Sequence, residues 1–308
     1  KIVTPDPIAE PVDDLQRPLI KILKHVFKII SPYFWGEKHT DVWSIGKFVA
    51  WVTGKNILDT RCRDGRWLAL PLPVYTSHFI QGPDYKRYNN DNIHPIMKRF
   101  AKPGTVAIDV GASCGQEIVT LSRAVGAQGR VYAFEPSFSF EALLRTVALN
   151  RLDNVVCIKA ACGSQNGRLG SSADTLYMVG EKTAYNEAAG IPVLRLDDFL
   201  AQIKETRAVS LIKIDTDGFE LEVIKGAVGT IRTHNTHVIS EFESHFDYSG
   251  VKGKDALNVY RNMGFSVAKI QTAYQTILPV DDEEYLTDMR VEENMIAHDI
   301  VLSWEGKK

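Results

Sequence analysis

The residues with the clearest capacity for chemistry lie in one short segment, Asp109 to Gly115, whose sequence DVGASCG directly follows an apolar run. Residues 106–110 (VAIDV) are typical of a buried parallel strand, and residues 117–125 carry apolar side chains at helical spacing. Glycine tolerates positive φ and lets a ligand approach the main chain closely. Because open α/β sheets bind nucleotides at a strand, a glycine-containing turn and a helix N-terminus, the segment predicts a site of that kind.

A second acidic residue bears on which nucleotide this turn would bind. Glu135 ends the apolar run of residues 130–134, 26 residues after Asp109, where its carboxylate can accept hydrogen bonds from both hydroxyls of a ribose. The turn lacks the middle glycine of the dinucleotide pattern GxGxxG, and a carboxylate near the turn disfavours phosphate. These features favour S-adenosylmethionine (SAM), which carries a sulfonium, an ammonium and no phosphate. A plain strand-to-helix turn is the alternative.

Three further acids follow the apolar run of residues 211–214: Asp215, Asp217 and Glu220. Charged side chains at the carboxyl ends of parallel strands line the crevice where ligands bind, so Asp215 is predicted to face the site. Asp217 suits either that site or the N-cap of a helix, and Glu220 is predicted to have a structural role.

The run that begins at residue 237 adds Glu241, Glu243 and His245, which strand alternation places on one face. Histidine titrates near neutral pH in an ordinary environment, so His245 is a candidate general base, with a surface histidine as the alternative. Oxygen-ligand chemistry would permit a divalent cation among Asp215, Asp217 and Glu241, but their spacing gives no specific support. No metal site is predicted.

The elements that must position these residues alternate between strand and helix from residue 105 onward, which indicates a parallel sheet with right-handed crossovers. The remaining strands are expected at residues 155–160, 211–214, 237–242, 265–270 and 300–304. The last two would form a closing pair. Residues 163–190 are polar and turn-rich, and a loop of that length is often functional.

Four blocks within residues 105–304 resemble the FkbM family of class I SAM-dependent methyltransferases. They are DVGASCG at 109–115, VYAFEP at 131–136, LDDFL at 196–200 and LIKIDTDGFE at 211–220. The last block resembles the family signature IKIDxEGxE. The chain departs from the family where Ser113 replaces the usual Asn and where Asp217 replaces the usual Glu. Both replacements are polar and shorter, so the reach of the carboxylate at residue 217 is changed.

This resemblance implies a Rossmann-like α/β fold with a mostly parallel, seven-stranded sheet and helices on both faces. It also implies SAM as the cofactor. The candidate cofactor-binding residues are Asp109, Gly111, Ser113, Gly115, Glu135, Pro136, Asn150, Ala161 and Asp215. The catalytic candidates are Asp215, which would lie beside the methyl group, with Asp217 and His245.

The methyltransferase domain is predicted at residues 101–308, and residues 1–100 form an extension of helical and β elements that would cap the site, dock or dimerise. A helix is expected between Asp13 and Ile30, with apolar residues on one side and Lys21, Lys24 and Lys28 on another. A basic amphipathic helix can lie on an anionic membrane or bind a partner. Docking on the catalytic domain or on a second subunit is the simpler interpretation.

The rest of the extension is expected to contain a largely buried helix at residues 41–52, strands at 66–75 and 78–80, and a helix at 93–100. Tyr85, Tyr88 and Asn90 are candidate contacts to the cofactor or acceptor, with a solvated loop as the alternative.

Composition restricts the classes of function. The net charge of −2 provides no overall positive field that would attract nucleic acid, so the charge does not favour a nucleic-acid-binding function. The four cysteines form no CxxC pair and no metal-type spacing with the eight histidines, as expected in a reducing compartment. No apolar run approaches the roughly 20 residues that span a bilayer, and there is no secretory signal pattern. A cytoplasmic location is expected, with peripheral membrane contact or homo-oligomerisation through the N-terminal helix left open.

The sequence therefore leads to one hypothesis and two alternatives. The hypothesis is a SAM-dependent O-methyltransferase that acts on a hydroxyl of a small-molecule or glycan acceptor, such as a sugar or secondary metabolite; the acceptor class comes from the resemblance alone. One alternative is an RNA 2′-O-methyltransferase, which would need a basic groove with aromatic side chains. The other is a non-catalytic nucleotide-binding module that docks through its N-terminal helix.

Overall fold

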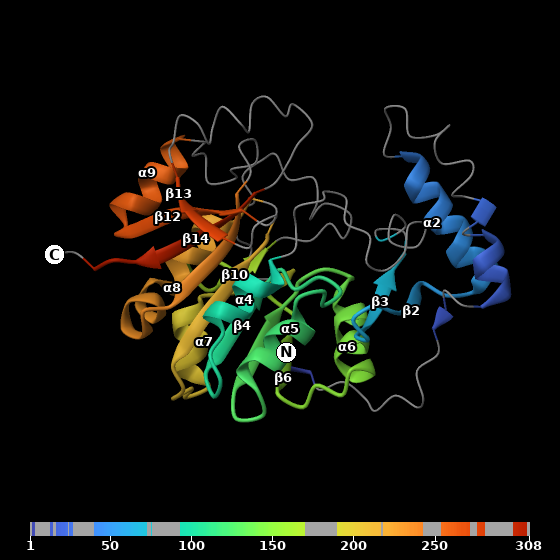
Figure 1. Ribbon diagram of the computed structural model, residues 1–308, viewed down its shortest axis with the longest axis horizontal. Helices are drawn as coiled ribbons and strands as arrows, with labels where there is room; N and C mark the ends of the chain where they lie inside the picture. Colours follow the sequence, from blue (N-terminus) through green and yellow to red (C-terminus); the bar gives the residue numbers. More distant parts are fainter. Residues whose placement is uncertain are drawn as a thin grey trace.

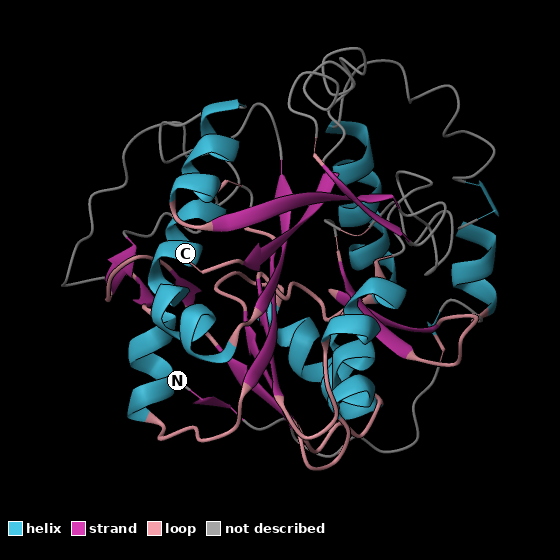
Figure 2. Ribbon diagram, turned by 60° about the vertical axis from the view of Figure 1, so that its left-hand side comes forward, coloured by secondary structure: helices cyan, strands magenta, loops and turns pink. Residues whose placement is uncertain are grey.

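The computed structural model describes residues 2–3, 13–14, 17–23, 25–26, 40–72, 75, 93–169, 190–216, 218–242, 254–271, 276–280 and 298–306. These residues form a central β-sheet with helices on both faces (Figure 2). A smaller group of elements from the extension lies at the end of the molecule opposite α9 (Figure 1). The predicted α/β architecture is confirmed.

The central sheet has nine strands. In spatial order they are β1 (Ile2–Val3), β6 (Val155–Ile158), β5 (Arg130–Phe134), β4 (Val106–Val110), β10 (Val209–Ile214), β11 (His237–Phe242), β14 (His298–Trp304), β12 (Phe265–Gln271) and β13 (Thr276–Pro279). The strands from β6 to β11 are parallel neighbours, whereas β14 is antiparallel to both β11 and β12. The seven strands from β6 to β12 match the predicted sheet, including its closing pair, and β1 and β13 extend it at the edges.

The strand order reverses between β4 and β10. From β4 the chain proceeds outward through β5 to β6, and it later returns to place β10 on the other side of β4. The connections that leave β4 and β10 therefore diverge, which opens a crevice at the carboxyl ends of these two strands. Ligands of open α/β sheets bind in that crevice.

Alternating residues of the central strands separate two apolar cores. Val106, Ile108 and Val110 of β4 face the core that contains helices α7 (Leu196–Gln202), α8 (Glu220–His234) and α9 (Lys254–Asn262). Ala107 faces the other core, which contains α4 (His94–Phe100), α5 (Ile118–Val125) and α6 (Phe140–Leu149). By alternation Asp109 lies on this second face, within an otherwise apolar layer.

A second, small sheet was not predicted. It consists of β7 (Ala161–Cys162), β9 (Ile191–Leu194) and β8 (Gly167–Leu169). The strand expected at 155–160 therefore ends at Ile158, and the beginning of the segment expected to be a loop forms β8. Strands of two to four residues are too short to show alternation in the sequence. Residues 170–189 lie outside the described residues.

The extension packs as a helix pair beside a β-hairpin. Helix α2 (Thr40–Thr53) confirms the helix expected at 41–52, but it is not largely buried, because Phe48 and Trp51 are exposed. Strand β2 (Ile57–Arg61) pairs with β3 (Trp67–Pro71), which is shorter than the strand expected at 66–75. The N-terminal helical segment, described at residues 18–23 and 25–26, begins at Pro18, within the range of residues 13–30 expected for it. Proline suits the first turn of a helix because it has no N–H to donate.

The hairpin docks onto helix α6 through polar contacts. Asp59 of β2 forms an ion pair with Arg145. The backbone N–H of Ala69 in β3 donates to the Thr146 hydroxyl at 3.0 Å. Side chains of α6 thus satisfy backbone groups at the outer edge of the hairpin.

None of the helices in the described part of the chain has the length and apolar character that crossing a bilayer requires.

Candidate functional site

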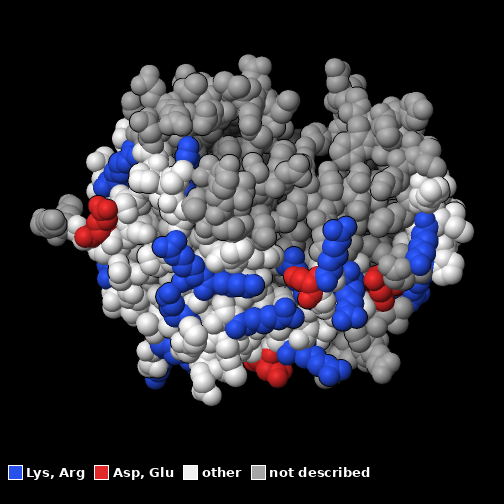
Figure 3. All heavy atoms as spheres, in the orientation of Figure 1, with Lys and Arg blue, Asp and Glu red and all other residues white. Residues whose placement is uncertain are grey.

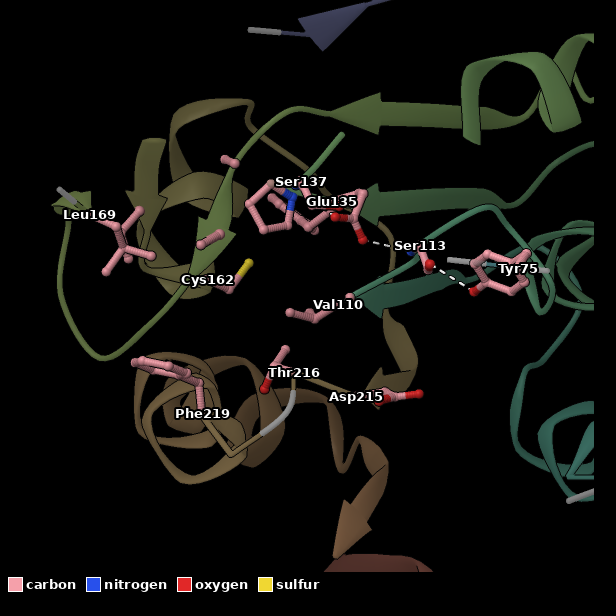
Figure 4. Close-up of a pocket in the computed structure, with 16 residues that line it drawn as sticks. Tyr75, Val110, Ser113, Glu135, Ser137, Cys162, Leu169, Asp215, Thr216 and Phe219 are labelled. Carbon is pink, nitrogen blue, oxygen red and sulfur yellow. Dashed lines mark hydrogen bonds between the residues drawn. The ribbon is translucent and has the colours of Figure 1, made fainter. Parts of the chain in front are cut away.

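A cavity of about 310 Å³ opens at the carboxyl ends of β4, β5 and β10, at the crevice where the strand order reverses. Its lining comes from the strand ends, the small sheet and one residue of the extension (Figure 4). The lining residues are Tyr75, Val110, Gly111, Ser113, Phe134, Glu135, Pro136, Ser137, Ala160, Ala161, Cys162, Leu169, Val193, Asp215, Thr216 and Phe219. The volume falls within the range of small-molecule sites.

The glycine turn is shaped by protein rather than by space left for a ligand. Gly111 has φ +78°, and a Cβ there would lie 1.7 Å from the backbone carbonyl oxygen of Asp215. Gly115 has φ +87°, and its Cβ would lie 3.1 Å from side-chain carbons of Leu143 and Thr146 in α6. The predicted need for positive φ is confirmed. Gly111 also lines the cavity, whereas Gly115 does not and instead lets α6 approach the turn.

Ser113 occupies the left-handed region with φ +47°. Asn and Asp adopt this region more readily than Ser, which gives a physical reason why the family usually has Asn here. The backbone N–H of Ser113 donates to Glu135 Oε2 at 2.7 Å, and the Ser113 and Tyr75 hydroxyls are hydrogen-bonded at 2.8 Å. Burial raises the pKa of the Tyr75 phenol, so it stays protonated at neutral pH. Ser113 thus connects the tip of β5 to the extension (Figure 4).

Glu135 is oriented by two backbone groups at the tip of β5. Its Oε2 accepts from Ser113 and its Oε1 accepts from the Ser137 N–H at 2.7 Å, while the side chain lines the cavity. Each carboxylate oxygen has a second lone pair that can accept a ligand hydroxyl. This arrangement suits a ribose diol, as predicted.

Asp109 does not line the cavity, which contradicts its predicted direct contact with the cofactor. It is fully buried on the α4–α5 face, opposite Lys213 of β10, whose Nζ lies 3.9 Å from Asp109 Oδ1. Within the described part of the chain, neither oxygen of Asp109 accepts a hydrogen bond. Burial raises the pKa of Asp109 to about 7, against the lowering effect of the Lys213 charge.

Lys213 also holds Asp215, the acid expected beside the methyl group. Lys213 Nζ donates to Asp215 Oδ2 at 2.9 Å, and the Asp215 side chain is 42% exposed towards the cavity. Desolvation acts to raise the pKa of Asp215, but the charge of Lys213 and hydrogen bonds with Glu241 and Lys213 outweigh it and lower that pKa. Asp215 is therefore a carboxylate at neutral pH. Sequence reasoning missed Lys213, although its place two residues before Asp215 puts both on one face of the strand.

Three other cofactor predictions have different outcomes. Ala161 and Pro136 line the cavity, as expected. Asn150 does not: its Nδ2 donates to the backbone oxygens of Trp67 and Thr146, both at 2.8 Å, and its Oδ1 accepts from the Trp67 N–H at 2.9 Å. Asn150 therefore joins α6 to the hairpin of the extension and lies outside the cavity lining, where a cofactor-binding residue was expected.

The remaining residues that the sequence singled out either have a structural role or lie outside the described residues. Glu220 Oε1 accepts from the Thr216 N–H and hydroxyl and from the Gly218 N–H at 2.9–3.1 Å, so Glu220 stabilises the loop after β10, as predicted. Asp217 and His245, with Glu243, Tyr85, Tyr88 and Asn90, lie outside the described residues.

The end of the cavity away from Asp215 is apolar, which the sequence did not predict. Cys162 and Leu169 of the small sheet face Phe219 there, whereas Tyr75 and Asp215 lie at the other end (Figure 4). Val193 of the small sheet also lines the cavity. One end suits a flat, weakly polar ring and the other a charged or hydroxylated group. No cluster of three or more metal-binding side chains occurs among the described residues.

Comparison with known proteins agrees with this geometry. Residues 109–267 match the family model of the methyltransferase FkbM domain. The chain belongs to the FkbM methyltransferase family. The FkbM resemblance drawn from the four sequence blocks is thereby confirmed.

Individual relatives of this FkbM-family chain are distant. It is 26% identical over 145 residues to Methyltransferase 1 of Beauveria bassiana (strain ARSEF 2860), covering 39% of this chain and 57% of that protein. Methyltransferase FkbM from Methylobacillus flagellatus KT is 16% identical with a TM-score of 0.40, covering 76% of this chain and 53% of that one. A SAM-dependent O-methyltransferase from Thermotoga maritima is 13% identical with a TM-score of 0.39, covering 81% and 78%. The chain thus spans little more than half the length of the first two relatives.

SAM is the methyl donor of this family, and the residues present fit it. Glu135 offers free lone pairs to the ribose hydroxyls, the small sheet and Phe219 offer an apolar slot for adenine, and Asp215 offers negative charge to the sulfonium. No basic side chain lines the cavity among the described residues, as suits a donor without phosphate.

Proposed function

We propose that this FkbM-family methyltransferase transfers the methyl group of SAM to a hydroxyl oxygen of a sugar, glycan or secondary metabolite. The observation that carries the proposal is Asp215, a partly exposed carboxylate at the polar end of the cavity that Lys213 keeps ionised. A hydroxyl needs an acceptor for its proton, and a carboxylate supplies one.

Within this proposal Asp215 orients the acceptor and receives its proton. SAM, when bound, supplies an electrophilic methyl group on a positively charged sulfur. A hydroxyl oxygen becomes strongly acidic as it gains the methyl group, so a weakly basic carboxylate is sufficient to take the proton. The ion pair with Lys213 holds the carboxylate in one position, which supports alignment of the acceptor oxygen. The sequence candidates Asp217 and His245 stay predictions for a second acid–base group.

Binding of the donor is the first test. Isothermal titration calorimetry with SAM and with S-adenosylhomocysteine is expected to show saturable binding of both. If neither ligand binds, the proposal fails. A panel of sugars, glycans and hydroxylated metabolites is then screened with radiolabelled SAM, with amines and RNA included, and O-methylated products are expected.

The role of Asp215 is tested by Asp215→Asn, which keeps the size of the side chain. We expect transfer to fall by at least about 100-fold while S-adenosylhomocysteine affinity changes much less. Asp198→Asn is the matched control, because Asp198 is an exposed acid of α7 that pairs with Arg195. Unchanged transfer in Asp215→Asn would remove Asp215 from the mechanism.

A further inference from the structure

The extension has an unusual concentration of exposed apolar side chains. Among the described residues, seven large hydrophobic side chains are exposed, and all but Phe138 and Leu278 belong to the extension. Those five are Leu19, Ile22, Val26, Phe48 and Trp51. Trp51 is 80% exposed and Ile22 is 61% exposed. Exposed apolar side chains concentrated in one part of a protein are typical of an interaction site.

These residues remain exposed although the helices that carry them already have a core. Ile20 and Leu23 of the N-terminal helical segment pack with Ile45 and Val49 of α2 and with Leu58 of β2. The inner face of this segment therefore packs within the extension, and this cluster contains no residue of the catalytic domain on which docking was expected.

The outer faces hold a second set of apolar side chains. Leu19, Ile22 and Val26 recur at helical spacing on the N-terminal helical segment. Phe48 and Trp51 stand one turn apart on α2, with ring centroids 6.0 Å apart. We call these five residues with Lys21 and Lys47 the outer surface of the extension.

The charge of this region is opposite in sign to that of the whole chain. Residues 15–55 contain seven Lys or Arg and two Asp or Glu, a net charge of +5, whereas the whole chain carries −2. Lys21 and Lys47 are exposed on the same two helical segments that carry these apolar residues. On the face seen in Figure 3, Lys and Arg are spread over the described surface and include side chains at the end of the molecule that contains α2.

We propose that the outer surface of the extension docks on the headgroup region of an anionic lipid bilayer. Exposed Trp, Phe, Leu and Ile flanked by lysine are the composition of helices that lie in the membrane interface. A second copy of the chain is a poorer occupant, because a twofold contact through this surface would bring two positive regions together. This proposal does not depend on the proposed methyl-transfer reaction.

Vesicle co-sedimentation of the full chain tests the proposal directly. We expect the protein to sediment with vesicles of phosphatidylcholine mixed with phosphatidylserine, to remain soluble with pure phosphatidylcholine, and to be released by high salt. Size-exclusion chromatography with light scattering runs in parallel. Failure to sediment with anionic vesicles, or assembly into a dimer that Trp51→Ser dissolves, overturns the proposal.

Matched variants assign the binding to these side chains. Lys21→Gln and Lys47→Gln are each expected to weaken binding about fivefold, and Trp51→Ser about tenfold or more. The controls are Lys225→Gln on α8 and Leu278→Ser on β13, which lie outside the extension and should bind as the unaltered protein does. Equal effects of the two sets would also overturn the proposal.

Fluorescence quenching tests the same contact with a milder substitution, in case Trp51→Ser folds poorly. In the unaltered protein, brominated lipid in anionic vesicles is expected to quench part of the tryptophan fluorescence. Trp51→Phe, which keeps an aromatic ring on α2, should bind nearly as well while that quenching largely disappears. Quenching that persists unchanged in Trp51→Phe would show that Trp51 does not contact the lipid and would overturn the proposal.

Discussion

The buried carboxyl of Asp109 should make the protein less stable as pH rises towards neutrality. Burial raises its pKa from 3.8 to about 7, so the folded protein binds a proton there that the unfolded chain releases. The stability that this proton contributes is fully present below about pH 4 and is lost as pH rises to about 7, a change of about 4 kcal/mol. Asp109→Asn has no such proton, so the difference between the two proteins should vary with pH by that amount.

Urea denaturation followed by circular dichroism, at several pH values between about 4 and 8, measures this difference. Asp109→Asn is expected to gain stability relative to the unaltered protein as pH rises, because Asn avoids the ionisation of a buried acid. Asp198→Asn serves as the control, since an exposed ion pair contributes at most about 1 kcal/mol. If Asp109→Asn and the unaltered protein keep parallel pH profiles, the Asp109 carboxyl is not titrating in a buried environment and the reasoning is wrong.

Further predictions concern the turn and the extension. Gly111→Ala should destabilise the protein by about 3 kcal/mol or more and abolish S-adenosylhomocysteine binding, because the new Cβ would overlap a backbone carbonyl. The control is Gly54→Ala, which is also at positive φ but has no atom within 4 Å of the new Cβ, so it should lose only the stability that the backbone strain costs. Asn150→Ala should lower the unfolding free energy by about 1–3 kcal/mol and leave the dissociation constant nearly unchanged, and weakened binding at unchanged stability would contradict this. Tyr75→Phe should weaken S-adenosylhomocysteine binding severalfold by freeing Ser113, which calorimetry can check.

Sequence reasoning succeeded where local pattern and sheet topology act together. Gly111, Ser113, Glu135 and Asp215 follow three neighbouring parallel strands, and parallel strands bring their carboxyl ends to one edge. Alternation along β10 was equally visible, so the pairing of Lys213 with Asp215 was within reach of the same argument.

The errors arose where distant parts of the chain decide the contacts. Asp109 lies near the right strand end, but its direction depends on which sheet face Ala107 packs against, and the turn sequence does not contain that information. The hydrogen bonds of Asn150 to the hairpin were not predicted, because its partner Trp67 is 83 residues away in the extension. Tyr75 lines the cavity because the hairpin that precedes it docks on α6. That long-range contact leaves no pattern in the local sequence.

The crowding at Gly111 changes what the glycine motif can be used for. The main chain beside Asp215 leaves no space for a methyl group at this position whether or not a ligand is present. Natural selection for folding alone would therefore retain this glycine in a relative that had lost every trace of activity. In a genome search the turn motif therefore indicates only descent from this family. The acids that follow β5 and β10 are the positions that distinguish active members from inactive ones.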